Sequence, residues 1–198
     1  MFLPGIAPYG ATADLVRFDA VAELSRVFLY DLPALALILY LFFADRSPGR
    51  FFFARPAAAD IRWALVAFAG LILTAGILSV LSSLIGRDTA LPLVEAPRGV
   101  FSWLVMPLTG ISTGYLEESY FRAYLLTRFS EAGIGPKRSI LASTVLFSLC
   151  HLYEGPWGIL NAAAAGVLLS LVFLKSRSVH GPAWAHGAYN ALVYAAGV

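Results

Sequence analysis

The hydrophobic and polar positions divide the chain into long apolar segments that are separated by short polar turns. A helix that crosses a membrane needs about 20 predominantly apolar residues, and fewer inside a bundle. Glycine and proline mark most of the turns, as at Gly135 and Pro136. The pattern predicts an all-α membrane protein, a polytopic bundle of about six transmembrane helices. The expected helices are Val27–Ala44, Ile61–Ile85, Val100–Phe129, Ser139–Tyr153, Trp157–Leu174 and Pro182 to the C-terminus.

A different pattern precedes the first of these segments. Between Thr12 and Phe28, apolar residues recur at near-helical spacing and alternate with charged ones. Such amphipathic spacing is typical of a helix that lies in the membrane surface. We therefore expect an N-terminal interfacial helix before the first span, within a single membrane-embedded domain that covers residues 1–198.

The composition excludes several other classes of protein. The chain has 198 residues, of which 59% are hydrophobic and 13% are charged. Soluble domains carry about 25% charged residues, so this chain has too little polar surface for an ordinary soluble domain. A net charge of +2 without a concentrated basic patch argues against nucleic acid as a partner. The single cysteine, Cys150, excludes an intrachain disulfide.

The basic residues of the predicted loops indicate an orientation, because Lys and Arg are enriched in cytoplasmic loops. The larger group is expected on the cytoplasmic side, with both chain termini outside. Arginine strongly outnumbers lysine, which is typical of a GC-rich bacterial genome, and the expected location is therefore a bacterial inner membrane. The larger group comprises Arg46, Arg50, Arg55, Arg62, Arg128, Lys137, Arg138, Lys175 and Arg177, and the smaller group comprises Arg17, Arg26, Arg87 and Arg98.

Charged residues interrupt the third apolar segment at Glu117, Glu118 and Arg122. A charge at membrane depth costs several kcal/mol unless it is paired or hydrated, so it indicates a functional site. Glu118 and Arg122 are four residues apart, share a helix face and are expected to pair. Glu117 is rotated by about 100° and has no such local cation, which makes it the better candidate for a general base. Taken alone, the cluster is equally compatible with a structural ion pair.

Two further pairs of polar or aromatic residues lie in later segments at the same spacing of four. Phe147 and His151 lie late in the fourth segment, and His186 and Asn190 lie in the last. His186 and Asn190 could donate hydrogen bonds to a developing oxyanion. The alternative for each is a hydrogen bond that joins two helices. A rise of about 1.5 Å per residue places Glu117, His151 and His186 at similar depth, which favours a shared site.

These three motifs carry a resemblance to a known family. Glu-Glu-x-x-x-Arg, Phe-x-x-x-His and His-x-x-x-Asn, each on its own apolar helix and in this order, resemble the CPBP family. That family comprises the type II CAAX prenyl endopeptidases and the bacteriocin-processing Abi-like proteins. The resemblance covers a catalytic core of about residues 100–198, and it implies an intramembrane endopeptidase.

The resemblance also implies a role for each motif residue. Glu117 would activate the attacking water, and His151 would help to orient it. His186 and Asn190 would stabilise the oxyanion. The supporting residues are Glu118, Arg122 and Phe147.

The residues alone leave the cofactor and the class of function open. Glu117, His151 and His186 could ligate a divalent metal such as zinc, but a His-Glu-x-x-His motif is absent, and a metal-free glutamate mechanism is favoured. The alternatives to a protease are a non-enzymatic partner-binding membrane protein and a small proton-coupled transporter. The expected partners are the lipid bilayer and a membrane-associated protein or peptide: a prenylated C-terminus, a bacteriocin leader or a sorting tail.

Other polar positions receive no catalytic role. His180 lies beside Gly181 and Pro182 and is expected to be solvated. Tyr153 and Glu154 are expected to end the fourth helix on the outer side. The Gly-x-Ser-x-Gly pattern at residues 110–114 is interpreted as helix packing, because a serine nucleophile on this motif needs a strand-to-helix turn.

Overall fold

A computed structural model describes residues 16–45, 48–85 and 94–196 of the chain. These residues are almost entirely helical, and two strands of two residues each pair in parallel. The expectation of an all-α protein is therefore confirmed. The elements are β1 Val16–Arg17, α1 Ala20–Arg26, η1 Val27–Asp31, α2 Leu32–Ala44, η2 Pro48–Phe53, α3 Ala58–Leu84, β2 Val94–Glu95, α4 Gly99–Glu117, η3 Glu118–Leu125, α5 Leu126–Glu131, α6 Pro136–Leu149, η4 Leu152–Glu154, α7 Gly155–Ser176 and α8 His180–Ala196.

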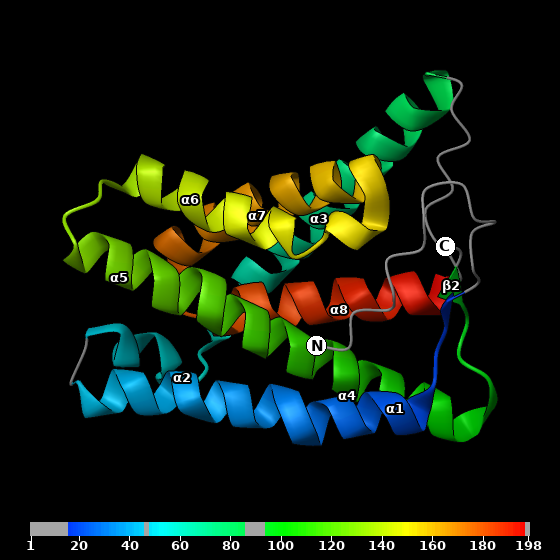
Figure 1. The fold of residues 1–198 in the computed structure, drawn as a ribbon, viewed down its shortest axis with the longest axis horizontal. Helices are drawn as coiled ribbons and strands as arrows, with labels where there is room; N and C mark the ends of the chain where they lie inside the picture. Colours follow the sequence, from blue (N-terminus) through cyan, green and yellow to red (C-terminus); the bar gives the residue numbers. More distant parts are fainter. Residues whose placement is uncertain (1–15, 46–47, 86–93, 197–198) are drawn as a thin grey trace.

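Helix α8 lies at the centre of the bundle, between α4 on one side and α3 on the other (Figure 1). Glycines allow α4 and α8 to approach closely. A Cβ atom on Gly114 would lie 2.4 Å from the Ala183 carbonyl oxygen, and one on Gly187 would lie 2.8 Å from the Gly110 oxygen. The small residues of the Gly-x-Ser-x-Gly pattern therefore serve helix packing, as the sequence predicts.

Three described segments are long and apolar enough to cross a membrane: Ala20–Ala44, Ala58–Leu84 and Leu152–Ser176. These segments expose large apolar side chains, such as Leu65 and Leu73 on α3, as expected of helices that face lipid. The chain is a multi-pass membrane protein. The other expected spans are also helices, but α6 has 14 residues and α8 has 17, and the α4–α5 rod contains the charged motif. A count of six spans stays a prediction.

The prediction of a separate interfacial helix is wrong. Thr12 lies outside the described residues, and Asp19 caps α1 by accepting hydrogen bonds from the next turn. From there α1 continues through the π-helical turn η1 into α2 without a break. Arg26 pairs with both Glu23 and Asp31, at 2.8 Å each, so these charges contact one another along the helix. The pairing lowers the cost of the two carboxylates within one continuous helix, which is counted as a single candidate span, Ala20–Ala44.

Contacts at one end of the bundle bring several basic residues together. We call this end, which carries Arg55, Arg128, Arg138 and Arg177, the basic end. Arg128 Nη2 donates to Asp45 at 2.7 Å, which joins α5 to the end of α2. Arg46 of the larger basic group and Arg87 of the smaller one, which both enter the predicted orientation, lie outside the described residues.

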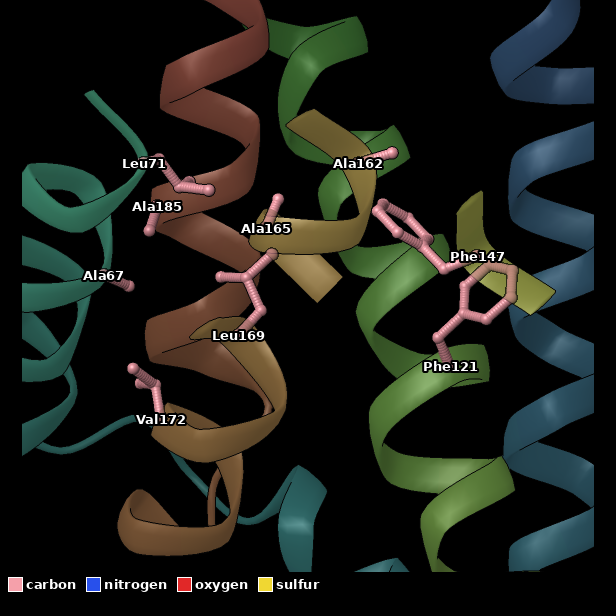
Figure 2. Packing of buried hydrophobic residues seen from close by; sticks show 9 residues of the cluster. All are labelled: Ala67, Leu71, Phe121, Phe147, Ala162, Ala165, Leu169, Val172 and Ala185. Atoms are coloured by element: carbon pink, nitrogen blue, oxygen red, sulfur yellow. The ribbon is translucent and has the colours of Figure 1, made fainter. Parts of the chain in front are cut away.

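The main hydrophobic core lies where α3, α7 and α8 meet, and it continues to η3 and α6. Figure 2 shows Ala67 and Leu71 on the α3 side, with the rings of Phe121 and Phe147 next to each other on the other side. The centroids of these two rings are 5.1 Å apart. Phe147 is 2% exposed, so its position on α6 is fixed by packing. The Glu-Glu-x-x-x-Arg and Phe-x-x-x-His motifs are thereby held together.

Candidate active site

The first motif lies where α4 passes into η3, and η3 is a π-helix over Glu118–Leu125. Stretches with i→i+5 hydrogen bonds are rare in proteins, and those that occur often lie at functional sites. Arg122 Nη1 lies 3.0 Å from Glu118 Oε1, so the pair that the spacing predicts is present. Both side chains are fully buried, and the guanidinium carbon lies 4.4 Å from the centre of the Phe147 ring. The buried charges are thus paired, and an aromatic face contacts the cation.

His186 of α8 lies against both carboxylates of this motif. Its Nδ1 lies 2.8 Å from Glu118 Oε1, and its Nε2 lies 3.6 Å from Glu117 Oε2. Because a carboxylate only accepts hydrogen bonds, Nδ1 carries a proton and donates it to Glu118. The imidazole therefore joins Glu118 to Glu117, although His186 lies 68 positions after Glu118 in the sequence.

His151 follows the end of α6 and is oriented by its own helix. Its Nδ1 lies 2.8 Å from the Phe147 carbonyl oxygen. Since a carbonyl accepts, Nδ1 is the protonated nitrogen, and Nε2 is left to interact with water or substrate. The Phe147 ring is 4.5 Å from the His151 ring and 6.0 Å from the His186 ring. Phe147 thus contacts both imidazoles.

Asn190 lies one helical turn beyond His186 on α8 and is partly buried. No protein group within the described ranges makes a hydrogen bond with its amide. The side chain therefore has both amide protons available to a ligand.

The two neighbouring glutamates differ in access to solvent. The Glu117 side chain is 26% exposed, whereas that of Glu118 is fully buried. Among the described residues, Glu117 Oε2 has no hydrogen-bond partner, and the same is true of Glu118 Oε2 and of the Arg122 nitrogens. Buried polar atoms are normally hydrogen-bonded, so unused bonding capacity at one place indicates a site for a ligand or for chemistry. Of the two carboxylates, Glu117 is the one that a water or a substrate can reach.

A metal ion would have to be held by Glu117 and by the Nε2 atoms of His151 and His186. In the part of the chain that the structure describes, no group of three His, Cys, Asp or Glu side chains has the arrangement of a metal site. Metal-free chemistry stays a prediction that needs a direct measurement.

The expectation of a solvated His180 is wrong. His180 is 8% exposed, its Nε2 donates to the Ala54 carbonyl oxygen at 2.6 Å, and its Nδ1 lies 2.8 Å from the Tyr115 hydroxyl. Trp184 Nε1 donates to the same hydroxyl at 2.8 Å. Because the Tyr115 hydroxyl oxygen accepts this hydrogen bond, its own O–H group can donate a hydrogen bond to His180 Nδ1. The network joins the start of α8 to α4 and to the segment before α3. The Gly-Pro pair beside His180 suggested a loop, but it begins a buried helix.

The comparisons with known proteins agree with this geometry. Residues 99–192 match the family model described as "Type II CAAX prenyl endopeptidase Rce1-like". No curated protein and no solved structure matches the chain. The matched segment begins with α4 and ends within α8, so it contains all three motifs and excludes α1–α3. The predicted resemblance is confirmed over this segment: residues 99–192 match the model of the Rce1-like type II CAAX prenyl endopeptidases, the family that the three motifs resemble.

Proposed function

We propose that the protein is an intramembrane endopeptidase that hydrolyses a peptide bond of a membrane-associated or lipidated protein by glutamate-activated water. One observation carries the proposal. His186 lies against Glu117 and Glu118, while Phe147 contacts both His186 and His151, so three motifs from separate helices converge on one point. The matched family is one of endopeptidases, which is the same class of reaction.

In this mechanism Glu117 is the general base. Its partly exposed carboxylate removes a proton from a water molecule, whose oxygen forms a bond with the scissile carbonyl carbon. His151 Nε2 accepts a hydrogen bond that orients the water. Glu117 then passes the proton to the leaving nitrogen as the C–N bond breaks, so the carboxylate is regenerated.

His186 and Asn190 stabilise the oxyanion that forms in between. The Asn190 amide donates one hydrogen bond, and His186 Nε2 donates another when the ring is doubly protonated, because the Nδ1 proton is already held by Glu118. Glu117 and Glu118 supply the counter-charge for that imidazolium. Arg122 in turn holds Glu118 in place.

The family description favours a prenylated C-terminus as the substrate, with a bacteriocin leader or a sorting tail as alternatives. We also propose that the basic end faces the cytoplasm of a bacterial inner membrane, because positive residues accumulate on that side. A substrate that carries a lipid anchor would then present its peptide from the bilayer.

The decisive experiment compares the parent with Glu117→Gln in lipid nanodiscs. The probes are a farnesylated peptide that ends in a CAAX-type sequence and an unmodified leader-type peptide, with products identified by mass spectrometry. Removal of the general base should lower cleavage by roughly 100-fold or more, because general-base catalysis contributes about 10²–10⁴-fold. The matched control is Glu131→Gln, which changes a carboxylate that pairs with Arg128 at the basic end. Retained cleavage in Glu117→Gln would overturn the mechanism.

A further inference from the structure

Glu154 is an acidic residue close to the site that the proposed mechanism does not use. It ends the single 3₁₀ turn η4, in which the Glu154 N–H donates to the His151 carbonyl oxygen at 3.0 Å. Side chains three residues apart eclipse each other in a 3₁₀-helix. Glu154 therefore lies on the same side of the turn as His151. Gly155, with φ of 74°, then redirects the chain into α7.

Gly158 of α7 provides the space for this side chain. A Cβ atom on Gly158 would lie 2.2 Å from Glu154 Cβ and 2.8 Å from Glu154 Oε2. The carboxylate consequently packs over the first turn of α7. The charged groups that interact with it electrostatically are His151, Glu117 and His186. Glu154 thus lies beside the first turn of α7, within electrostatic range of the proposed catalytic groups.

The carboxylate of Glu154 differs from the other described carboxylates in its partners. Two aspartates, Asp19 and Asp60, accept hydrogen bonds from backbone N–H groups at helix starts. The remaining ones pair with arginine or contact His186, whereas Glu154 forms no ion pair with a Lys or Arg of the described ranges. The paired residues are Glu23, Asp31, Asp45, Glu95, Glu117, Glu118 and Glu131.

Tyr153 shares a side-chain hydrogen bond with this carboxylate, and two further tyrosines lie within electrostatic range of it. Tyr153, Tyr189 and Tyr194 all interact with it electrostatically, and they come from η4 and from α8. Tyr153 is 52% exposed, so this edge of the site can be reached from outside the protein. A carboxylate beside aromatic rings is the combination that binds ammonium and guanidinium groups, through charge and through the ring faces.

We propose that Glu154 and these tyrosines form a subsite for a basic side chain of the peptide substrate, Lys or Arg, close to the scissile bond. The inference rests on the proposed endopeptidase function. A peptide bond held between Glu117 and His151 has neighbours at about 3.3–3.6 Å per residue in an extended chain. A long basic side chain one or two residues away can therefore reach a carboxylate that interacts with both of those groups.

The test uses farnesylated peptides that are identical except for Lys, Gln or Glu at each position flanking the cleaved bond. The ratio of kcat/KM for Lys over Glu is measured for the parent, Glu154→Gln and Glu154→Lys in nanodiscs. At one position the parent should favour Lys by roughly 10-fold or more, because opposite charges attract and like charges repel across a binding site. Glu154→Gln should bring that ratio near 1, and Glu154→Lys should reverse it. Gly158→Ala, which displaces the carboxylate, should also reduce it.

Two outcomes would overturn the subsite. One is a Lys preference that is the same in the parent and in Glu154→Gln. The other is an equal loss for all peptides, which would mean that Glu154 acts through the catalytic groups and not on the substrate. Glu131→Lys is the matched control for charge reversal at a distance.

A binding measurement separates this proposal from the proposed function. The affinities of the Lys and Glu peptides are compared in the Glu117→Gln background, with and without Glu154→Gln, so that turnover is not needed. If the parent cleaves no peptide but the Lys preference in binding depends on Glu154, the subsite stands and the endopeptidase fails. If cleavage occurs and the preference is independent of Glu154, the endopeptidase stands and the subsite fails.

Discussion

The helices α1–α3 and the matched segment 99–192 differ in how their buried charges are satisfied. In α1–α3, Arg26 donates to both oxygens of Asp31 and also to Glu23, and Asp60 accepts from the backbone N–H of Ala57 at 2.8 Å. In the matched segment, Arg122 and Glu118 are fully buried, yet the Arg122 nitrogens and Glu118 Oε2 make no hydrogen bond within the described residues.

This difference separates charges that serve structure alone from charges that also keep hydrogen-bonding capacity for a ligand. A charge whose bonding capacity is used by its neighbours stabilises a helix and has nothing left for a ligand. A charge that keeps free capacity at membrane depth costs free energy, so its presence there indicates chemistry. The following predictions test that separation, from the largest expected effect to the smallest.

Asn190→Ala should lower turnover by roughly 100-fold, because removal of one oxyanion donor costs about 10²–10³ in kcat. The matched variant in the other region is Thr74→Ala on α3, where the hydroxyl donates to the Gly70 carbonyl oxygen. It should leave cleavage within about twofold of the parent. Initial rates on the farnesylated peptide measure both. Equal losses in the two variants would remove the distinction between the regions.

Glu118→Ala should destabilise the protein by about 3–5 kcal/mol, because it leaves Arg122 buried without its partner. Asp31→Ala should cost less, about 1–3 kcal/mol, because Arg26 keeps Glu23 and is itself 31% exposed. Equilibrium unfolding in mixed detergent micelles gives both values. A Glu118→Ala variant as stable as the parent would show that the buried pair is not structural.

Glycines extend the comparison to helix packing. Gly114→Ala places a Cβ atom 2.4 Å from the Ala183 oxygen, so α4 and α8 must separate, at a cost of about 1–3 kcal/mol. On α3, a Cβ on Gly76 meets nothing within 4 Å, and Gly76→Ala should stabilise by about 0.5–1 kcal/mol through helix propensity. Thermal melts in one detergent should show shifts of opposite sign. Shifts of the same sign would contradict the packing assignment.

Removal of metal should have the smallest effect. If Glu117 acts on a free water, dialysis against a strong chelator leaves cleavage unchanged, and elemental analysis finds well under one metal per chain. A stoichiometric metal that disappears in His186→Ala, together with activity that returns only with added metal, would replace the glutamate mechanism by a metal-dependent one.

Most of the correct sequence predictions came from the spacing of residues that are close together in the chain. Apolar runs and Gly-Pro turns located the helices, and a spacing of four residues located the pair of Glu118 and Arg122. The contact between Glu118 and His186 joins residues 68 positions apart, and no local pattern encodes it. Only their similar predicted depth and the order of the motifs, through the family resemblance, suggested that they share a site.

The errors of the sequence reasoning have physical reasons as well. The charges before the first span were interpreted as facing headgroups, but Arg26 pairs with Glu23 and Asp31 within one continuous helix. His180 was expected in a loop because of its Gly-Pro neighbour, whereas its partners Tyr115 and Ala54 come from distant segments. Glu154 had no motif, and only the 3₁₀ turn brings it beside His151.

The π-helix η3 also determines how the faces of α4 are rotated relative to those of α5, because the three elements form one continuous helical rod. Hydrogen bonds of the i→i+5 type fit additional residues into the length of an α-helical segment, and each residue of an α-helix turns the chain by about 100°. The glycines of α4 can therefore face α8 while Leu126, at the start of α5, faces the core beside α2. Deletion of Tyr120, a partly exposed residue of η3, would let the rod become α-helical throughout. The rod would remain intact, but one of its two ends would then present the wrong face to its neighbours.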